Sequence, residues 1–121
     1  MKNAINLFEI FVENMPRAVA FYESSLGLAL KQETFGGMPQ AIFPGEDLGV
    51  RGSLVKHPVR RPTAEGALVY LDASGKLDVV LRRVPEAGGA VVMPRTDIGD
   101  PGYIALIRDT EGNVVGLHEP R

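Results

Sequence analysis

The feature that most constrains this chain is an order of sequence patterns that occurs twice, with a spacing of about 60 residues. A strand-like stretch, a helix that ends at glycine and three further strand-like runs fill the first half, and the same order follows in the second. Phe21 corresponds to Val80 in this comparison, and Gly27 corresponds to Gly88. The regular spacing predicts two similar β-α-β-β-β units.

The first unit, residues 1–57, begins with a strand at residues 5–12, where two sets of side chains alternate. Asn14 is a suitable N-cap for the helix that follows, Pro16 lies in its first turn, and Gly27 marks its end. Turn-forming glycines and prolines separate the runs after the helix. The remaining predicted strands of this unit span residues 28–35, 38–44 and 49–56.

A proline- and arginine-rich connector at about residues 58–65 leads to the second unit, residues 66–121. Pro85 interrupts the second helical pattern, and because proline removes a helix hydrogen bond, we expect a kink or an early end near Val84. The predicted elements of this unit are a strand at 66–72, a helix at 75–89 and strands at 90–94, 102–109 and 113–120.

In each unit, the single helix can cover only one face of the sheet, which leaves the other face open. Two such units side by side would enclose a cleft. We therefore predict one α+β domain over residues 1–121, with a curved mixed sheet around a cleft and the helices on the outer face.

Composition excludes several function classes. A chain of 121 residues with 45% hydrophobic residues and a net charge of −2 lacks the basic excess of a nucleic-acid binder. Its apolar runs are too short for a membrane span, and its first residues do not resemble a secretory signal, so a cytoplasmic location is expected. Cysteine is absent, which excludes thiol nucleophiles and zinc–thiolate sites.

Two motifs, "RAVAFYESSLG" after the first strand and "RDTEGNVVGLHEP" at the end, make the chain resemble the vicinal oxygen chelate superfamily. This superfamily includes glyoxalase I, bleomycin-resistance proteins and extradiol dioxygenases. The resemblance covers nearly the whole chain and supports the duplicated fold. It does not identify a reaction, because members share a scaffold and differ in chemistry.

The resemblance also identifies where metal-dependent members carry their ligands. These positions are occupied here by Leu7, Gly116 and, through the internal repeat, Ser53 and Gly66. A divalent ion needs several converging imidazole or carboxylate groups, which these residues do not supply. We therefore predict no metal and no cofactor, although a shift of two residues in the alignment would bring in Glu9 and His118.

Strand alternation places Leu7, Glu9 and Phe11 together on the cleft side of the first strand. Glu9 is then a carboxylate on a mostly apolar surface, and it could act as a general base or anchor a substrate. A structural ion pair between Glu9 and Arg108 is the alternative.

The same alternation directs His118 to the cleft near its rim and sends Glu119 the other way, into solvent. His118 is a candidate proton carrier, because imidazole titrates near neutrality, or else an ordinary surface histidine. Tyr70 and Leu68 are expected to line the cleft, and Tyr70 could also stack on a ligand. Arg108 could bind an anionic ligand or be an exposed hairpin residue.

Two functions remain open. The first is a binding protein that holds a small hydrophobic or aromatic molecule in a metal-free cleft, as bleomycin-resistance proteins do. The second is a lyase, isomerase or dioxygenase of the same superfamily, which would be metal-dependent through displaced ligands or metal-free with Glu9 as its base. The resemblance further implies a homodimer, in which the cleft can be shared between two chains.

Overall fold

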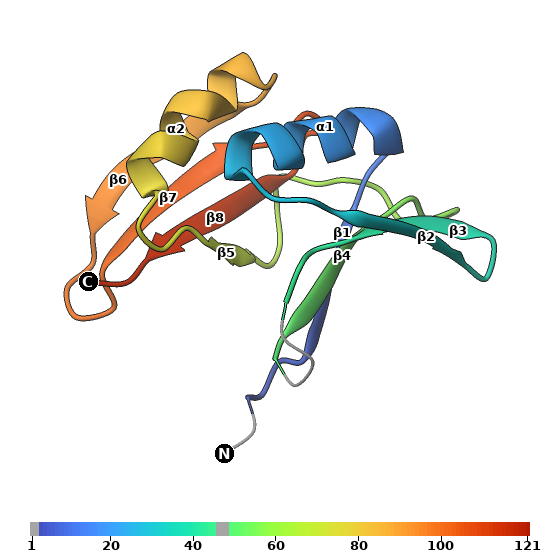
Figure 1. Cartoon of the computed structure of the whole chain (residues 1–121), viewed down its shortest axis with the longest axis horizontal. Coiled ribbons are helices and arrows are strands. Elements are labelled where there is room, and N and C mark those ends of the chain that lie inside the picture. Colours follow the sequence, from blue (N-terminus) through green and yellow to red (C-terminus); the bar gives the residue numbers. More distant parts are fainter. Residues whose placement is uncertain (1–2, 46–48) are drawn as a thin grey trace.

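The structure is a computed structural model that describes residues 3–45 and 49–121. Over these residues the chain forms two helices and eight strands (Figure 1). In chain order the elements are β1 (Leu7–Phe11), α1 (Met15–Leu26), β2 (Lys31–Phe35), β3 (Met38–Ile42), β4 (Arg51–Val55), β5 (Tyr70–Asp72), α2 (Leu77–Glu86), β6 (Ala90–Asp97), β7 (Tyr103–Arg108) and β8 (Val114–Glu119).

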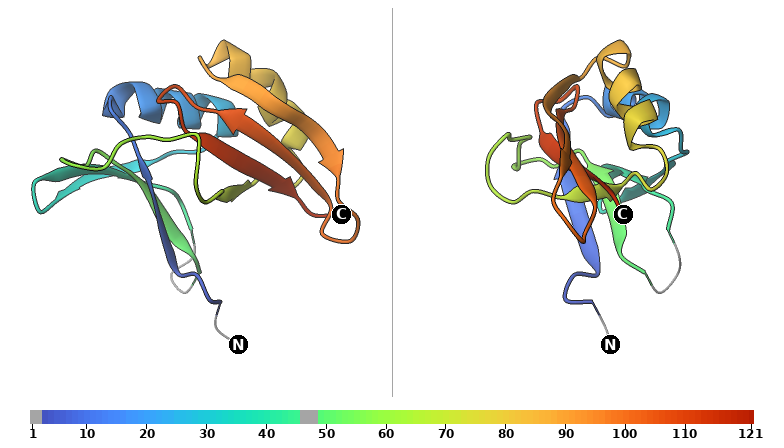
Figure 2. Two further views of the ribbon diagram at one scale, coloured as in Figure 1. Left: turned by 180° about the vertical axis from the view of Figure 1, so that it is seen from behind. Right: turned by 90° about the vertical axis from the view of Figure 1, so that its left-hand side faces the viewer.

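Each unit forms its own four-stranded sheet, and the two sheets share one topology. The strand orders are β1-β4-β3-β2 and β5-β8-β7-β6. The first strand of each unit pairs in parallel with the last, and the other neighbours pair antiparallel. Both helices lie side by side along the same side of the two sheets (Figures 1 and 2). The predicted α+β fold of tandem β-α-β-β-β units is confirmed.

The ends of α1 follow the sequence closely. The Asn14 side chain accepts a hydrogen bond from the backbone N–H of Arg17 at 3.0 Å. Gly27 ends the helix with a φ of 68°, a left-handed conformation that glycine adopts without steric cost. Helix α2 continues two residues past the expected end at Val84, because the exposed Pro85 lies in the last turn and disturbs little of the helix.

All eight strands differ in length from their predictions, and the largest changes in either direction are in β5 and β6. Strand β5 has only three residues, whereas β6 extends to Asp97. Pro94 is tolerated inside β6 because this strand lies at the edge of its sheet, where a missing N–H leaves no neighbour unpaired. The register of β6 against β7 shifts on either side of Met93, which is consistent with a bulged edge strand.

The core lies between the helices and the inner faces of the sheets. Helix α1 contacts β3, β4 and α2, and α2 contacts β6 and β8. The alternation predicted for the first and last strands is present, since Ile10 and Leu117 are buried whereas Leu7 is exposed. The largest fully buried side chains include Tyr22, Phe21, Leu26, Leu54, Leu77, Ile107 and Leu117.

A buried hydrogen-bond network around Asp109, in the turn between β7 and β8, joins the two units. Asp109 Oδ2 accepts from the Tyr22 hydroxyl at 2.6 Å and from Asn113 Nδ2 at 3.0 Å. The amide of Asn113 also donates to the carbonyl oxygen of Phe11 at 2.8 Å. Burial, and then the neighbouring Asp109 carboxylate, raise the pKa of Tyr22 well above its usual value, so the phenol remains a donor.

Glu111, in the same turn, makes a second connection to the first unit. Its carboxylate accepts from the backbone N–H groups of Glu13 and Asn14 at 2.9 and 2.7 Å and from Arg17 Nε at 2.7 Å. Burial alone would raise the pKa of Glu111, but these hydrogen bonds outweigh it and lower the pKa below its usual value. The β7–β8 turn is therefore fixed to the start of α1.

Neither helix in the described residues is long and apolar enough to cross a membrane.

Replacing Tyr22 by phenylalanine removes one donor from the buried Asp109 carboxylate. We expect Tyr22→Phe to lower the free energy of unfolding by about 1–3 kcal/mol, because the acceptor stays buried with one partner fewer. Urea unfolding measures this, with Tyr70→Phe as the matched control, since the half-exposed Tyr70 makes no comparable buried hydrogen bond. Equal effects of the two substitutions would contradict the role given to Tyr22.

Candidate functional site

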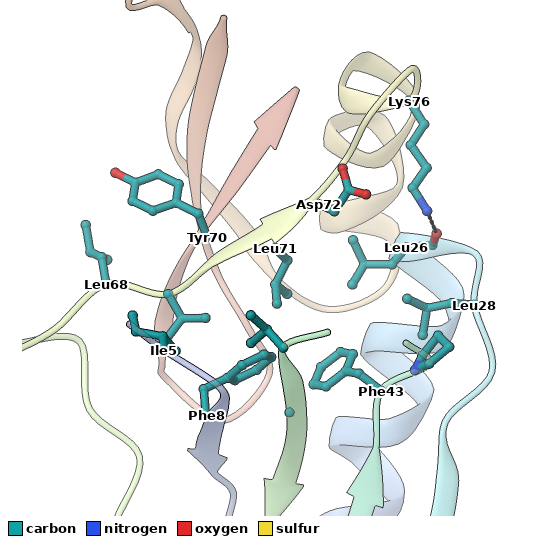
Figure 3. Close-up of a pocket in the computed structure, with 14 residues that line it drawn as sticks. Ile5, Phe8, Leu26, Leu28, Phe43, Leu68, Tyr70, Leu71, Asp72 and Lys76 are labelled. Atoms are coloured by element: carbon teal, nitrogen blue, oxygen red, sulfur yellow. Dashed lines mark hydrogen bonds between the residues drawn. The ribbon is translucent and has the colours of Figure 1, made fainter. Parts of the chain in front are cut away.

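The candidate site is a pocket of about 690 Å³ between the two units (Figure 3). One wall comes from β1, β4 and the residues around the end of α1, and the other comes from β5 and the segment that leads into α2. Its lining residues are Ile5, Phe8, Leu26, Leu28, Phe43, Pro44, Val50, Gly52, Leu68, Val69, Tyr70, Leu71, Asp72 and Lys76.

Two aromatic rings, Phe8 and Phe43, belong to the wall from the first unit. Phe8 and Phe43 lie next to each other, with ring centroids 5.8 Å apart and a tilt of 39° between the ring planes. The Phe8 ring lies directly over Gly52 of β4, since a Cβ at Gly52 would come within 2.0 Å of Phe8 Cζ. Behind Phe43, the buried Tyr22 makes an edge contact at 5.6 Å, which holds the Phe43 ring in place.

The wall from the second unit uses the same combination of an aromatic ring and a glycine. Tyr70 is paired with Gly116 of β8, and a Cβ at Gly116 would come within 2.3 Å of the Tyr70 ring. Leu71, next along β5, is buried and faces the pocket from the core side. Glycine in a strand interior often marks a close approach by another group, and here both glycines admit aromatic rings.

The polar end of the pocket consists of Asp72 and Lys76, at the junction between β5 and α2 (Figure 3). Asp72 Oδ1 accepts hydrogen bonds from the backbone N–H and the hydroxyl of Ser74. Lys76 Nζ donates to the carbonyl oxygen of Leu26 at 2.9 Å and so connects the start of α2 to the end of α1. The rest of the lining is predominantly apolar.

Of the residues predicted from the sequence, Leu68 and Tyr70 line this pocket. Leu7, Glu9 and Phe11 lie on the face of β1 opposite to Phe8, as strand alternation requires. On that face Leu7 and Glu9 are exposed, and the Phe11 ring makes an edge contact with His57, with centroids 5.6 Å apart.

Arg108 and His118 lie on the second sheet. His118 pairs with Asp72 across β5 and β8, and its Nε2 lies 2.6 Å from the carbonyl oxygen of Pro101. Because a carbonyl oxygen only accepts, Nε2 carries the proton and Nδ1 of a neutral ring is the acceptor. Arg108 is exposed at the end of β7, and within the described part of the chain no ion pair joins it to Glu9.

Glu119 was expected to be solvated, and this expectation was wrong. Its Oε1 accepts from the backbone N–H of Leu77 at 3.3 Å, and its Oε2 accepts from Arg95 at 2.8 Å. A carboxylate at a helix N-terminus satisfies a free N–H group and interacts favourably with the helix dipole. Hydrogen bonding to Leu77 is the main reason that the pKa of Glu119 is lowered.

Sequence comparison assigns this fold to a family. The profile of the Glyoxalase/Bleomycin resistance protein/Dioxygenase superfamily matches residues 4–117, nearly the whole chain. The chain belongs to this superfamily. The match confirms the resemblance to vicinal oxygen chelate proteins that the motifs indicated. Among curated proteins, none has a sequence that matches this chain.

Solved structures of the superfamily include close structural matches. A glyoxalase/bleomycin resistance protein from Albidiferax ferrireducens T118 has a TM-score of 0.74 and 15% identity, covering 98% of this chain and 100% of that one. A glyoxalase/bleomycin resistance protein from Streptomyces sp. CB03234 has a TM-score of 0.68 and 27% identity, covering 95% and 99%. TnmS3, an antibiotic binding protein from the same Streptomyces, has a TM-score of 0.69 and 24% identity, covering 98% and 97%.

The residues at the positions that the resemblance implies for metal ligands do not fit a divalent ion. Leu7, Gly66 and Gly116 have no side-chain donor atoms, and the buried Ser53 hydroxyl faces Gln40 Oε1 at 3.5 Å. Over residues 3–45 and 49–121, no three histidine, aspartate or glutamate side chains gather to hold a metal. No metal chemistry is therefore assigned to this member of the superfamily.

Substitutions at Gly52 and Gly116, the two glycines under the aromatic rings, compare how tightly each ring is confined. We expect Gly52→Ala to destabilise the fold by about 1–3 kcal/mol, because the half-buried Phe8 must leave its position and crowd the pocket. Gly116→Ala should cost less, since the half-exposed Tyr70 ring can move into solvent.

Urea unfolding of the two variants makes the comparison, with Gly45→Ala as control, because among the described residues a Cβ there meets only the Val50 carbonyl oxygen, at 3.5 Å. A smaller loss for Gly52→Ala than for Gly116→Ala would show that the Phe8 ring is not confined as described.

Proposed function

We propose that this protein binds a small apolar or aromatic molecule in the pocket between its two units. The observation that carries the proposal is the pocket itself. It has a volume of about 690 Å³, enough for a small ligand, and its lining is mostly apolar. Small-molecule sites typically measure about 300–1,000 Å³ and combine an apolar lining with a few polar groups. The pocket has both features, with Asp72 and Lys76 as its charged groups.

The walls favour a ring-shaped ligand. Phe8 and Tyr70 each lie over a glycine of the neighbouring strand, so neither ring can sink further into its own sheet. Side chains that are positioned before binding lose little conformational entropy when a ligand arrives. Aromatic rings also stack on planar ligands with a gain beyond the burial of apolar area.

Binding without a reaction agrees best with the chemistry of the lining. Lys76, the only amine among the described lining residues, is already hydrogen-bonded to Leu26, and Asp72 is anchored by Ser74. The antibiotic binding protein TnmS3 has the same fold, so the scaffold can serve binding. Both Glu9 and His118 lie outside the pocket lining. The roles predicted for them in an enzyme stay predictions.

The remaining predicted residues support a second proposal, that two copies of the chain associate. The edge strands β1 and β5 carry exposed apolar side chains, with Leu7 60% and Tyr70 44% exposed. The open face of β1 carries Glu9 and that of the second sheet carries Arg108, two residues of opposite charge that could meet across a contact between copies. A partner that covers both faces would bring the predicted site residues of two chains together.

The ligand proposal is tested with N-phenyl-1-naphthylamine, a neutral aromatic dye that fluoresces in apolar surroundings. We expect saturable binding near one dye per chain. Tyr70→Ala should weaken it about tenfold, since losing a stacked ring costs on the order of 1.4 kcal/mol.

Phe35→Ala is the matched control for this substitution, because Phe35 is an aromatic residue of similar exposure that lies outside the pocket. No saturable binding, or equal losses in the two variants, would refute the proposal.

The association proposal is tested by sedimentation equilibrium. We expect a species of twice the chain mass of 13.1 kDa, and a shift towards the monomer in Leu7→Lys, because the charge would be buried in the contact. Val59→Lys is the control, since Val59 is also apolar and is a more exposed residue of the connector. A monomer at high protein concentration would rule the association out.

A further inference from the structure

One oxygen of the Asp72 carboxylate accepts hydrogen bonds from the protein, and the other is available to a ligand. Ser74 donates both its backbone N–H, at 2.9 Å, and its hydroxyl to Oδ1. Within the described residues, no hydrogen bond to Oδ2 is formed. The turn at Ser74 therefore orients the carboxylate and leaves an acceptor at the polar end of an otherwise apolar pocket.

Lys76, the other charged residue at this end, is directed elsewhere. Its Nζ donates to the carbonyl oxygen of Leu26 at 2.9 Å, across the junction between the two helices. No ion pair connects Lys76 with Asp72 in the described part of the chain. The Lys76 ammonium group connects the two helices, and the Asp72 carboxylate is the charged group that remains for a ligand.

The protonation state of Asp72 agrees with this role. Hydrogen bonds from Ser74 are the main cause that lowers the pKa of Asp72, and the nearby charge of Lys76 lowers it further. The carboxylate is therefore ionised at neutral pH and can only accept hydrogen bonds. A ligand carboxylate placed beside it would be repelled, whereas a protonated amine would gain a charge-assisted hydrogen bond.

We propose that the ligand of this pocket is a compact ring compound with a protonated amine that donates to Asp72 Oδ2 while its ring lies between Phe8 and Tyr70. This inference rests on the proposed binding function and adds the class of the ligand. The amine selects the polar end of the pocket, and the apolar walls select the ring. Asp72 is thus the residue that determines specificity.

Three naphthalene compounds of similar size test the inference: 1-naphthylmethylamine, 1-naphthalenemethanol and 1-naphthaleneacetate. Their affinities are measured by calorimetric titration into the full chain at low salt. We expect the amine to bind about fivefold more tightly than the alcohol, the gain typical of a partly exposed ion pair, and the carboxylate to bind weakest. The preference for the amine should shrink as salt is added.

Asp72→Asn should bring the amine down to the affinity of the alcohol and leave the alcohol unchanged. The substitution keeps the shape of the side chain and its acceptor for Ser74. Asp100→Asn is the matched control, because it makes the same change of charge at an exposed position outside the pocket lining. It should leave the ranking of the three compounds as it is.

The outcomes separate this inference from the function on which it rests. Equal binding of the three compounds, or tightest binding of the carboxylate, would overturn the role of Asp72 while the pocket remained a binding site. An unchanged ranking in Asp72→Asn would do the same. If none of the compounds bound and the neutral dye also failed to bind, the proposed function itself would fall.

Discussion

The arrangement of the two units depends on the hydrogen bonds that the buried carboxylate of Asp109 accepts. Its partners come from both units, with the Tyr22 hydroxyl on α1 and the Asn113 amide in its own turn. Asn113 in turn reaches the backbone of β1 at Phe11. A buried polar group that loses a partner costs free energy, so the Tyr22 hydroxyl of the first unit stabilises this turn of the second.

Helix α1 connects this network to the pocket. Its start is held by Glu111, and its last residue, Leu26, lines the pocket. A helix of its 12 residues is about 18 Å long, so contacts at one end fix the other. Lys76 completes the frame, because it binds the end of α1 to the start of α2. The pocket therefore forms where the two sheets are held at a fixed distance.

The internal repeat does not relate the two walls of this pocket to each other. By the spacing of the repeat, Tyr70 corresponds to Phe11, yet its counterpart across the pocket is Phe8, on the other face of β1. The two aromatic walls thus come from different faces of equivalent strands. A duplicated scaffold has here produced an asymmetric site, in which the charged residues of the described lining, Asp72 and Lys76, both come from the second unit.

The sequence by itself determined the fold, because local signals predict its elements. These signals are the alternation in β1 and β8, the Asn14 cap, the helix end at Gly27 and the repeat. It also placed Leu68 and Tyr70 in the pocket. It could not indicate Phe8, Phe43 and Asp72, since their meeting depends on how the two sheets pack rather than on any local pattern. Gly52 and Gly116 were the available signal, because glycine inside a strand marks a close approach, but what approaches them was decided only by the tertiary structure.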